Sequence, residues 1–573
     1  MKLENRKIIV AILCCLLLAL CSCGQAQVSE TYLQTTRDTT SATVETTTDV
    51  STTTVKETTR INPTTTTKAK ITPAVTTETI PTTTQSTTAE TIATTTETKT
   101  TTAVTKATTS ETTKPTPVVT PTSTSQALDE AAALIHREAL VIDTHCDTVL
   151  KIIDSSTWLP KVNISQTTSF MVDIPKLQTG GIDLQVFASY TSGYAQEGGG
   201  QDFAKANSRL LALINGVKWT LRKNPQSLLP VERHNDIELA VQSGKTGVMA
   251  SIEGAYSFSD TTGIELLKQY RDLGIRMLAL TWNYSNALGE GVNETYRDGK
   301  SSSGGLTDLG RAVVIEMNKM GIIVDVSHLN EATFWDVLAV TSVPVIASHS
   351  SADYLCQNVR NLNDSQIQAI AASGGVVHVN FHRPFLAADA DSVTIDTLVD
   401  HIDHIVDLVG IDFVGLGSDF DGAKMPQGLE NASKVPMITR ELLARGYAED
   451  DINKILGGNA NRLIRAVFAH ASQLLPVSGV PVIVPELAMG TGIPTGTPVL
   501  NAVINHEAGK ELDLDSLAIV VDGVVYSPEY DAATRTITLA LTAPLTEKFH
   551  VVTFLAAFQG GETARETLVF YIK

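Results

Sequence analysis

Eight short apolar runs alternate with mostly amphipathic helical segments between residues 126 and 472, and this alternation constrains the fold more than any other feature. The runs cover residues 140–147, 181–190, 246–254, 275–283, 321–328, 343–350, 374–381 and 413–419. Near-continuous apolar strands separated by helices are typical of a parallel sheet covered by helices. Eight such units predict an α/β fold, a (β/α)8 TIM-like barrel. A doubly wound open sheet is the alternative, because periodicity alone does not establish closure.

Side chains that bind metals stand at the C-terminal ends of five of these runs. They are His145 and Asp147 on the first run, and Glu253, His328, His349 and Asp419 on later runs. Active sites of barrel enzymes are built at this end of the strands. His145 and Asp147 are two residues apart, so their side chains leave one strand on the same face. Because the opposite ends of the runs lack such residues, a metal site explains the pattern better than surface solubility does.

Imidazole and carboxylate groups are common ligands of divalent metals. This set of ligands predicts two adjacent ions, with Glu253 bridging them. The first run supplies two ligands, the third a carboxylate, and the fifth and sixth an imidazole each. A pair of neighbouring ions can share a hydroxide and hold both the attacking and the departing atoms. We expect Asp419 to accept the proton of that hydroxide and pass it to a leaving amine.

Longer motifs in the same region carry a family resemblance. They are IDTHCD (142–147), MVDIPKLQTGGIDLQVFASY (171–190), SIEGA (251–255), VDVSHL (324–329), IASHSSA (346–352), CQNVRNLND (356–364), VGLGSDFDG (414–422) and ILGGNANRL (455–463). With these motifs the segment from Ala131 to Val467 resembles the membrane (renal-type) dipeptidases, zinc metallopeptidases of the amidohydrolase-like barrel superfamily. The resemblance implies an enzyme that hydrolyses dipeptides with a free C-terminal carboxylate and tolerates D-residues at the C-terminal position.

The resemblance also implies roles for individual residues and two zinc ions per chain. One zinc would be bound by His145, Asp147 and Glu253, and the other by Glu253, His328 and His349. Asp419 aligns with the proton-transferring aspartate of the family. Arg360 matches the arginine that pairs with the terminal carboxylate of the substrate, a role that suits a planar guanidinium. Family members are often dimeric, which makes a homodimer one possible assembly, while the sequence itself leaves the oligomeric state open.

One position departs from the family pattern. In family members of the mammalian type, the fourth strand motif contains a histidine, and this histidine helps to polarise the scissile carbonyl. In this chain the motif reads LTWN, and Trp282 occupies the position of that histidine. An indole N–H donates one hydrogen bond but carries no positive charge. Either Asn283 or Tyr284 takes over this substrate-binding role, or the second zinc acts alone as the Lewis acid.

Two other functions remain open on the sequence. The same barrel and metals are compatible with an amidohydrolase-type enzyme that acts on another amide or on a lactone. A metal-poor surface binding protein is the other alternative, suggested by Trp282 and by a long N-terminal stalk. The formal charge of -19 argues against nucleic acid as a partner.

The N-terminus predicts export and anchoring. Residues 1–23 combine a basic start, an apolar stretch and LCSCG, which resembles a bacterial lipobox with Cys23 as the lipidated residue. Cys21 is the weaker candidate, and an ordinary secretory peptide is the alternative. Residues 24–125 are rich in Thr and have almost no large apolar side chains, which predicts a disordered linker. We expect an extracellular enzyme that a lipid anchors to the plasma membrane of a bacterium, close to the cell wall.

The C-terminal part has a different pattern. Residues 473–573 contain Pro- and Gly-rich stretches followed by alternating β runs, which predict a small β-sandwich-like domain. The sequence leaves three roles open for it: binding of wall polymer, docking on the barrel, and service as a spacer. Cys146 and Cys356, the only cysteines after residue 23, are expected to be buried thiols.

Four histidines outside the predicted metal site have other assignments. His378 lies within a strand and is expected to pack in the barrel. His401 and His404 lie on one amphipathic segment and are expected to form a surface pair. His382, just after a strand, is a minor candidate for lining the active-site pocket.

Overall fold

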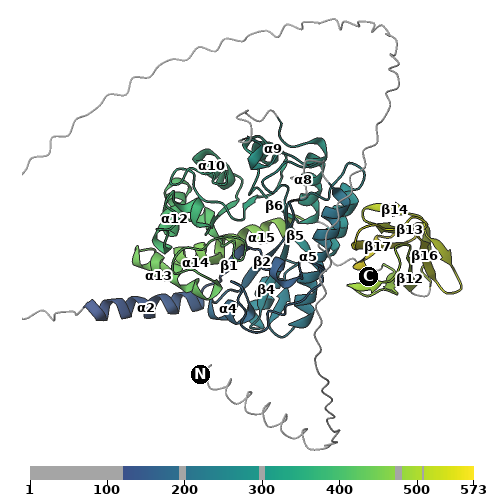
Figure 1. The fold of residues 1–573 in the computed structure, drawn as a ribbon, viewed down its shortest axis with the longest axis horizontal. Helices are drawn as coiled ribbons and strands as arrows, with labels where there is room; N and C mark the ends of the chain where they lie inside the picture. Colours follow the sequence, from purple (N-terminus) through teal and green to yellow (C-terminus); the bar gives the residue numbers. More distant parts are fainter. Residues whose placement is uncertain (1–120, 193–201, 296–303, 472–479, 506–508) are drawn as a thin grey trace, which may run out of the picture. The chain divides into compact units, whose positions relative to one another are not determined.

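The computed structural model describes residues 121–192, 202–295, 304–471, 480–505 and 509–573 (Figure 1). The predicted signal peptide, Cys23 and the linker up to residue 120 lie outside the described residues. Helix α2 (Pro121–Glu138) begins ahead of Gln126, where we expected the linker to end. None of the helices in these ranges has both the length and the hydrophobicity needed to cross a membrane.

The predicted barrel is confirmed. Its strands are β1 (Ile142–Cys146), β2 (Leu184–Tyr190), β4 (Thr246–Glu253), β5 (Ile275–Ala279), β6 (Ile323–Asp325), β7 (Ile346–Ala347), β8 (Val376–Asn380) and β9 (Val414–Gly417). All neighbouring pairs are parallel, and the pairing of β2 with β4 closes the ring, with Tyr190 opposite Glu253. An open sheet would leave β2 and β4 unpaired with each other, so this closure excludes the doubly wound alternative. A further strand that the sequence analysis missed, β3 (Leu228–Pro230), pairs with the start of β4.

Helices surround the barrel, as Figure 1 shows. The longer ones are α5 (Phe203–Lys223), α7 (Gly263–Asp272), α8 (Asp308–Met320), α9 (Glu331–Val340), α10 (Asp364–Ala372), α12 (Ile395–Val409), α13 (Pro436–Ala444) and α15 (Asn459–His470). Short segments are α3 (Val149–Ile152), α4 (Ile174–Thr179), α6 (Asp236–Gln242), η2 (Val292–Thr295), α11 (Arg383–Leu386), η3 (Ile411–Phe413), η4 (Ala432–Lys434), α14 (Glu449–Asn453) and η5 (Lys454–Gly458). Asp202, Thr307 and Asn330 each cap a helix by accepting a backbone N–H three residues later. These caps fix where the chain enters α5, α8 and α9.

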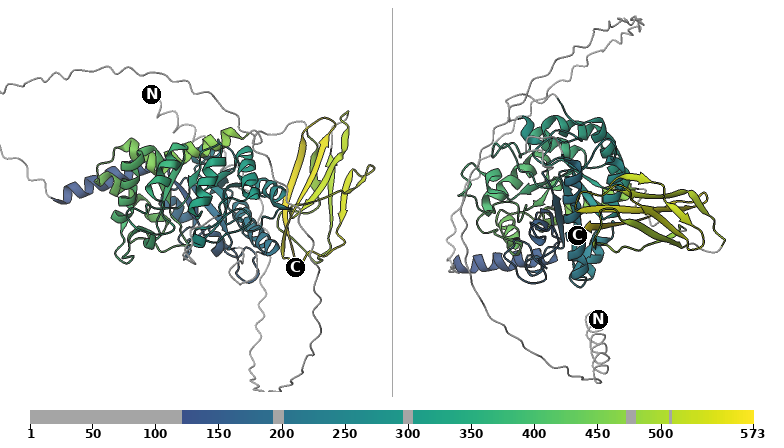
Figure 2. Two further views of the ribbon diagram at one scale, coloured as in Figure 1. Left: turned by 90° about the horizontal axis from the view of Figure 1, so that it is seen from above. Right: turned by 45° about the vertical axis from the view of Figure 1, so that its right-hand side comes forward.

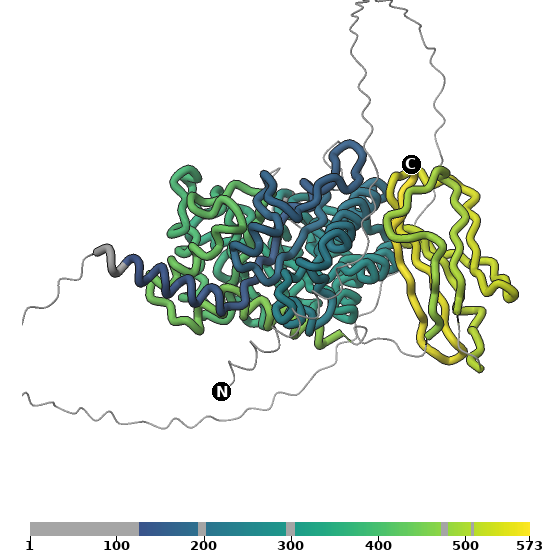
Figure 3. The backbone as a smooth tube through the Cα atoms, turned by 90° about the horizontal axis from the view of Figure 1, so that it is seen from below, coloured from purple at the N-terminus to yellow at the C-terminus, as the bar shows by residue number. Residues whose placement is uncertain are grey.

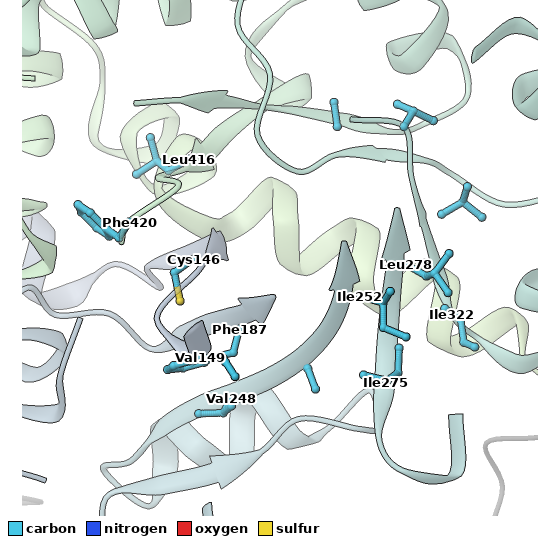
Figure 4. Packing of buried hydrophobic residues seen from close by; sticks show 14 of the residues in the cluster. Cys146, Val149, Phe187, Val248, Ile252, Ile275, Leu278, Ile322, Leu416 and Phe420 are labelled. Atoms are coloured by element: carbon cyan, nitrogen blue, oxygen red, sulfur yellow. The ribbon is translucent and has the colours of Figure 1, made fainter. Parts of the chain in front are cut away.

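Apolar side chains close the barrel at the end opposite to the polar residues. Ile142 and Ile323, at the starts of their strands, share a buried cluster with Leu463 and Val467 of α15. A larger cluster fills the space around the strands, and Figure 4 shows part of it, including Phe187 beside Val149 and Val248. Packed layers of this kind make the barrel a solid core and not a pore. The strand ends that carry the polar residues therefore stand on a rigid base.

Helix α2 leads into the barrel. It packs along α13 before the chain turns into β1, and its course can be followed in Figure 3. His136 near its end is buried and has Nδ1 2.7 Å from Thr439 Oγ1 and Nε2 2.8 Å from the Gly180 carbonyl. These contacts tie the helix to two other parts of the barrel.

His378 of β8 and His401 of α12 are buried, whereas His404 of α12 is partly buried, with Nε2 2.8 Å from Asp364 Oδ1. His378 is fully buried, with Nδ1 3.3 Å from the Ala347 carbonyl, which confirms the packing role predicted for it. The prediction of a surface pair was wrong for His401, which is also fully buried. Its ring joins two loops, since Nδ1 accepts the Ala352 N–H and Nε2 lies 3.0 Å from the Leu386 carbonyl. An amphipathic pattern did not reveal this, because the polar partners of His401 are backbone groups of distant segments.

The chain ends in two β-sheets, as predicted (Figure 2). One contains β10 (Val482–Pro485), β12 (Val499–Asn505), β16 (Thr536–Ala540) and β15 (Glu529–Asp531) in that order. The other contains β11 (Thr491–Ile493), β18 (Thr563–Ile572), β17 (Phe549–Phe558), β13 (Leu512–Val521) and β14 (Val524–Tyr526). Buried side chains from both sheets, among them Leu500, Ile519 and Phe554, form one shared cluster.

The second sheet contacts the barrel helices α5 and α7. The buried Gln269 of α7 donates to the Val520 carbonyl and to Thr553 Oγ1, and its Oε1 accepts the Gly523 N–H. Ser208 of α5 accepts the Phe549 N–H through Oγ. Among the three roles considered for this region, docking on the barrel is the one that these contacts support.

Candidate metal centre

Five buried side chains meet at the C-terminal end of the barrel. They are His145, Asp147, Glu253, His328 and His349, each no more than 6% exposed. The carboxylate of Glu253 lies between the histidines. Its Oε2 is 3.6 Å from His145 Nε2, and its Oε1 is 2.8 Å from His328 Nε2 and 3.7 Å from His349 Nε2. The sequence analysis predicted this convergence from strand ends alone.

The chemistry of these residues fits divalent metal ions. The ligand atoms of His145, Glu253 and His349 lie within 4.8 Å of one another, as do those of His145, Asp147 and Asp419. His145 Nε2 and Asp147 Oδ1 are buried and have no hydrogen-bond partner within the described part of the chain. Buried polar atoms without partners are costly unless they coordinate an ion. The two groups of ligand atoms, which share His145, therefore form a candidate metal centre.

The local charge balance points to the same conclusion. Burial, opposed by His145 and reinforced by Asp147, raises the pKa of Glu253 to about 8. Burial by itself would lower the pKa of His145, but Glu253 and Asp147 outweigh it and raise that pKa to about 10. Burial lowers the pKa of His328 and His349 well below the usual range. Such crowding of buried carboxylates is what a cation would neutralise.

Backbone geometry at the strand ends turns two of the predicted residues toward the centre. His328 and Asp419 have φ angles of 68° and 61°, in the left-handed region that non-glycine residues seldom adopt. His328 is held there by its carbonyl, which accepts hydrogen bonds from the Val292 N–H and from Thr281 Oγ1. Strained conformations of this kind persist only where the surrounding structure fixes them, and they are frequent at functional sites.

Asp143 joins the two strands that carry Asp147 and Asp419. Its buried carboxylate accepts hydrogen bonds from the backbone N–H and Oγ of Ser418, at 2.8 and 2.6 Å. It also accepts from Gln185 Nε2 at 2.8 Å. Asp143 was not among the predicted site residues, although it stands two residues before His145 on the same strand and within the motif IDTHCD.

Asp419 lies beside the ligand groups. Its Oδ2 accepts a hydrogen bond from Asn380 Nδ2 at 3.1 Å, and burial, with Asp147 adding to it, raises its pKa to about 7. Gly422 leaves room for both carboxylates, because a Cβ there would overlap Asp147 Oδ2 and crowd Asp419 Oδ1. Asn380 and Gly422 are further residues that sequence reasoning missed.

A cavity of about 270 Å³ opens in front of the candidate ligands. Its walls include Leu150, Tyr190, Trp282, Asn283, Arg360, His382, Phe385 and Asp419. Arg360 is 6% exposed, donates through Nη2 to the His349 carbonyl at 3.2 Å, and keeps Nε without a partner within the described residues. Burial lowers its pKa to about 10, although Glu253 and Asp419 act in the opposite direction. A buried guanidinium with an unused N–H beside a cavity is suited to bind a carboxylate.

The three residues predicted around the fourth strand motif occupy different places. Trp282 lines the cavity, with its ring 5.2 Å from that of Tyr190 and 6.2 Å from that of His328. Asn283 lines it too, and its Oδ1 lies 2.7 Å from His328 Nδ1. Tyr284 is not among the lining residues; its carbonyl accepts a hydrogen bond from the Tyr256 hydroxyl at 2.6 Å.

His382 and the two cysteines complete the set of predicted residues. His382 lines the cavity, and its Nδ1 accepts the Lys424 N–H at 3.1 Å. Cys146 and Cys356 are free and buried, as expected. Burial raises the pKa of the Cys146 thiol well above its usual value, so neither its position nor its protonation suits a metal ligand.

Comparisons with known proteins agree with the geometry. The family model described as membrane dipeptidase (peptidase family M19) matches residues 129–476. An uncharacterised protein from the pqqA 5′ region of Klebsiella pneumoniae is 39% identical over 236 residues, which cover 41% of this chain and 86% of that protein.

Two solved structures are also similar to this chain. A metallopeptidase described as dipeptidase AC is 27% identical with a TM-score of 0.51, covering 58% of this chain and 99% of its own. The other is a metallopeptidase from Rhodobacter sphaeroides, liganded with a phosphinate mimic of the dipeptide L-Ala-D-Ala. It is 26% identical with a TM-score of 0.51, and the match covers 57% of this chain and 99% of that protein.

Proposed function

This chain belongs to the membrane dipeptidase family, peptidase family M19, and on that premise we propose that it is a di-zinc enzyme that hydrolyses dipeptides with a free C-terminal carboxylate. The observation that carries the proposal is the position of Glu253, whose two carboxylate oxygens face different histidines. A single carboxylate shared in this way suits two neighbouring ions. Histidine nitrogen and carboxylate oxygen are typical zinc ligands.

The proposed ligands fall into two sets. His145, Asp147 and Glu253 would hold one ion, and Glu253, His328 and His349 the other. Bound zinc supplies a hydroxide nucleophile at neutral pH and a Lewis acid for the scissile carbonyl. Asp419, buried next to Asp147, accepts the proton of the nucleophile at Oδ1 or Oδ2 and returns it to the leaving amine.

Arg360 orients the substrate. Its buried guanidinium forms one wall of the cavity, and its unpaired Nε can complete a two-point contact with the terminal carboxylate. Leu150, Tyr190, Trp282 and Phe385 supply apolar and aromatic surface around the side chains of the substrate. The L-Ala-D-Ala mimic in the Rhodobacter sphaeroides structure supports a preference that includes C-terminal D-residues. Short peptides released from the cell wall are a suitable source of such substrates.

The cellular setting is part of the same proposal. The lipobox-like LCSCG with Cys23 and the Thr-rich stretch up to residue 125 support an enzyme anchored by lipid outside the plasma membrane. Labelling with a fatty-acid probe tests this: incorporation should depend on Cys23 and disappear in Cys23→Ala. The resemblance to dimeric family members supports a homodimer, which light scattering of the purified protein would test.

Metal analysis and a substrate panel test the enzymatic proposal. We expect close to two zinc ions per chain after dialysis and hydrolysis of Gly-D-Ala and L-Ala-D-Ala. Turnover of lactones or cyclic amides without any dipeptide cleavage would favour the other amidohydrolase-type function. Metal content near zero would favour the surface binding protein.

A further inference from the structure

Three residues that are not metal ligands form hydrogen-bonding chains to the Nδ1 atoms of His328 and His349. We propose that Asn283 is a positioning residue that holds His328 with its proton on Nδ1, and that Ser348 with Asp325 does the same for His349. This inference rests on the proposed function, because it assigns a purpose to these contacts only if a metal is bound. Its consequence is that both Nε2 atoms present a lone pair toward Glu253.

The contacts of His328 determine its tautomer. Asn283 Oδ1 lies 2.7 Å from His328 Nδ1, and an amide oxygen accepts hydrogen bonds but does not donate them. Nδ1 must therefore carry the proton of the neutral ring. Nε2, 2.8 Å from Glu253 Oε1, is then the unprotonated nitrogen. Only that form of the imidazole can bind a metal on the Glu253 side.

Asn283 is itself fixed in place. Its carbonyl accepts the Asn293 N–H at 2.8 Å, which anchors the segment that follows β5. The imidazole approaches from the left-handed turn at His328, whose carbonyl is bound to the Val292 N–H. Both groups are thus held by backbone contacts within the chain.

A hydroxyl performs the corresponding task for His349. Ser348 Oγ lies 2.5 Å from Asp325 Oδ2 and 2.7 Å from His349 Nδ1. Asp325 is buried, and its Oδ1 accepts the backbone N–H groups of Ser327 and Ser348, both at 3.0 Å. Because Asp325 only accepts, the single proton of the hydroxyl points to the carboxylate. The hydroxyl oxygen then accepts the proton of His349 Nδ1.

The two chains of hydrogen bonds come from different elements of the barrel, and both place the proton of the histidine on Nδ1. Asn283 follows β5, whereas Asp325 ends β6 and Ser348 follows β7. Both histidines direct Nε2 inward, and these nitrogens lie 2.9 Å apart. Residues that fix ligand tautomers in this way commonly change metal affinity by about 10- to 100-fold when they are replaced.

Paired substitutions at residue 283 test the proposal in the purified full-length protein. Asn283→Leu removes the acceptor, whereas Asn283→Asp keeps an acceptor at the same place and cannot donate. The readout is zinc affinity at each site, measured by competition with a chromophoric chelator, together with the visible spectrum of the cobalt-substituted protein. Circular dichroism checks that each variant is folded.

We expect Asn283→Leu to weaken one of the two zinc sites by about 10- to 100-fold and to leave the other within about threefold of its original affinity. Asn283→Asp should keep both. Ser348→Ala should also weaken one site, and its cobalt spectrum should change as that of Asn283→Leu does. Wild-type affinity at both sites in Asn283→Leu would overturn the proposal for His328.

Equal losses in the Asp and Leu variants would overturn the tautomer assignment, since they would mean that the amide nitrogen of Asn283 donates to His328. Failure of the proposed function has a different signature. In that case the unaltered protein would itself bind no zinc, or would bind two ions and cleave no dipeptide.

Discussion

Glu253 Oε1 and His328 Nε2 lie 2.8 Å apart, while the other carboxylate oxygen of Glu253, Oε2, lies 3.6 Å from His145 Nε2. This arrangement connects strands that are far apart in the sequence. One carboxylate close to both histidines would make the two proposed metal positions interdependent.

Replacing the shared carboxylate should therefore disturb both positions. Glu253→Gln keeps the size of the side chain but removes its charge and leaves one oxygen, so we expect the protein to retain at most one zinc. Activity on L-Ala-D-Ala should fall by at least about 100-fold. Elemental analysis of the dialysed protein measures the loss. Glu441→Gln, which alters a remote ion pair with Arg445, is the matched control and should keep both ions.

The proposed role of Asp419 is proton transfer, which differs from the metal binding proposed for its neighbours. Asp419→Asn cannot accept a proton but retains the hydrogen-bonding shape, so kcat should fall by about 10²- to 10⁴-fold with the metal content unchanged. Steady-state kinetics combined with metal analysis distinguishes the two effects. An Asn variant with near-normal kcat would remove Asp419 from proton transfer.

Arg360 should matter only for substrates with a free carboxylate. A hydrogen bond to a charged group contributes about 1.5–3 kcal/mol, so Arg360→Ala should lower kcat/KM for L-Ala-D-Ala by about 10- to 150-fold. The amidated dipeptide, which lacks the charge, should be affected little. Comparable losses on both substrates would contradict carboxylate binding by Arg360.

Gly422 provides the space in which Asp147 and Asp419 lie. Gly422→Ala introduces a Cβ that would overlap Asp147 Oδ2, so we expect weaker metal binding in a protein that is still folded. Zinc competition titration measures the affinity, and circular dichroism verifies the fold. An alanine variant that binds zinc with unchanged affinity would show that the carboxylates can move aside.

The contact between His550 and Asp522 predicts a pH-dependent contribution to stability. His550 Nδ1 lies 2.6 Å from Asp522 Oδ2; burial alone would lower the pKa of His550, but Asp522 outweighs it and the pKa is raised. A histidine with a raised pKa in the folded state stabilises the protein fully below its unfolded pKa of about 6.5. That contribution is lost as the pH rises through the higher folded value.

His550→Gln should accordingly destabilise the protein more at pH 5.5 than at pH 9.5. Urea unfolding of the variant and of the unaltered protein at both pH values measures the difference. A loss of stability that is the same at both pH values would mean that the contact depends on shape and not on charge.

The barrel and the candidate metal ligands could be predicted from the sequence because both depend on short-range patterns. Buried parallel strands are continuous apolar runs, and His145, Asp147, Glu253, His328 and His349 each stand where such a run ends. The supporting contacts could not be read in the same way. Asp143 with Ser418, and His401 with two backbone groups, join residues that only the closed barrel brings together.

The role of Asn283 illustrates the same limit. From the sequence it was a candidate to take over the substrate-binding role of the family histidine that Trp282 replaces. Its contact with His328 depends on the left-handed backbone conformation at that histidine. No local sequence pattern predicts this conformation.

Hydrolysis of L-Ala-D-Ala by the purified protein, before and after removal of metal with a chelator and again after addition of zinc, is the most direct test of a metal-dependent dipeptidase. We predict that activity is lost with the metal and returns as zinc is restored to two ions per chain. Cleavage at the same rate by the metal-free protein, or none by the fully loaded protein, would contradict the account.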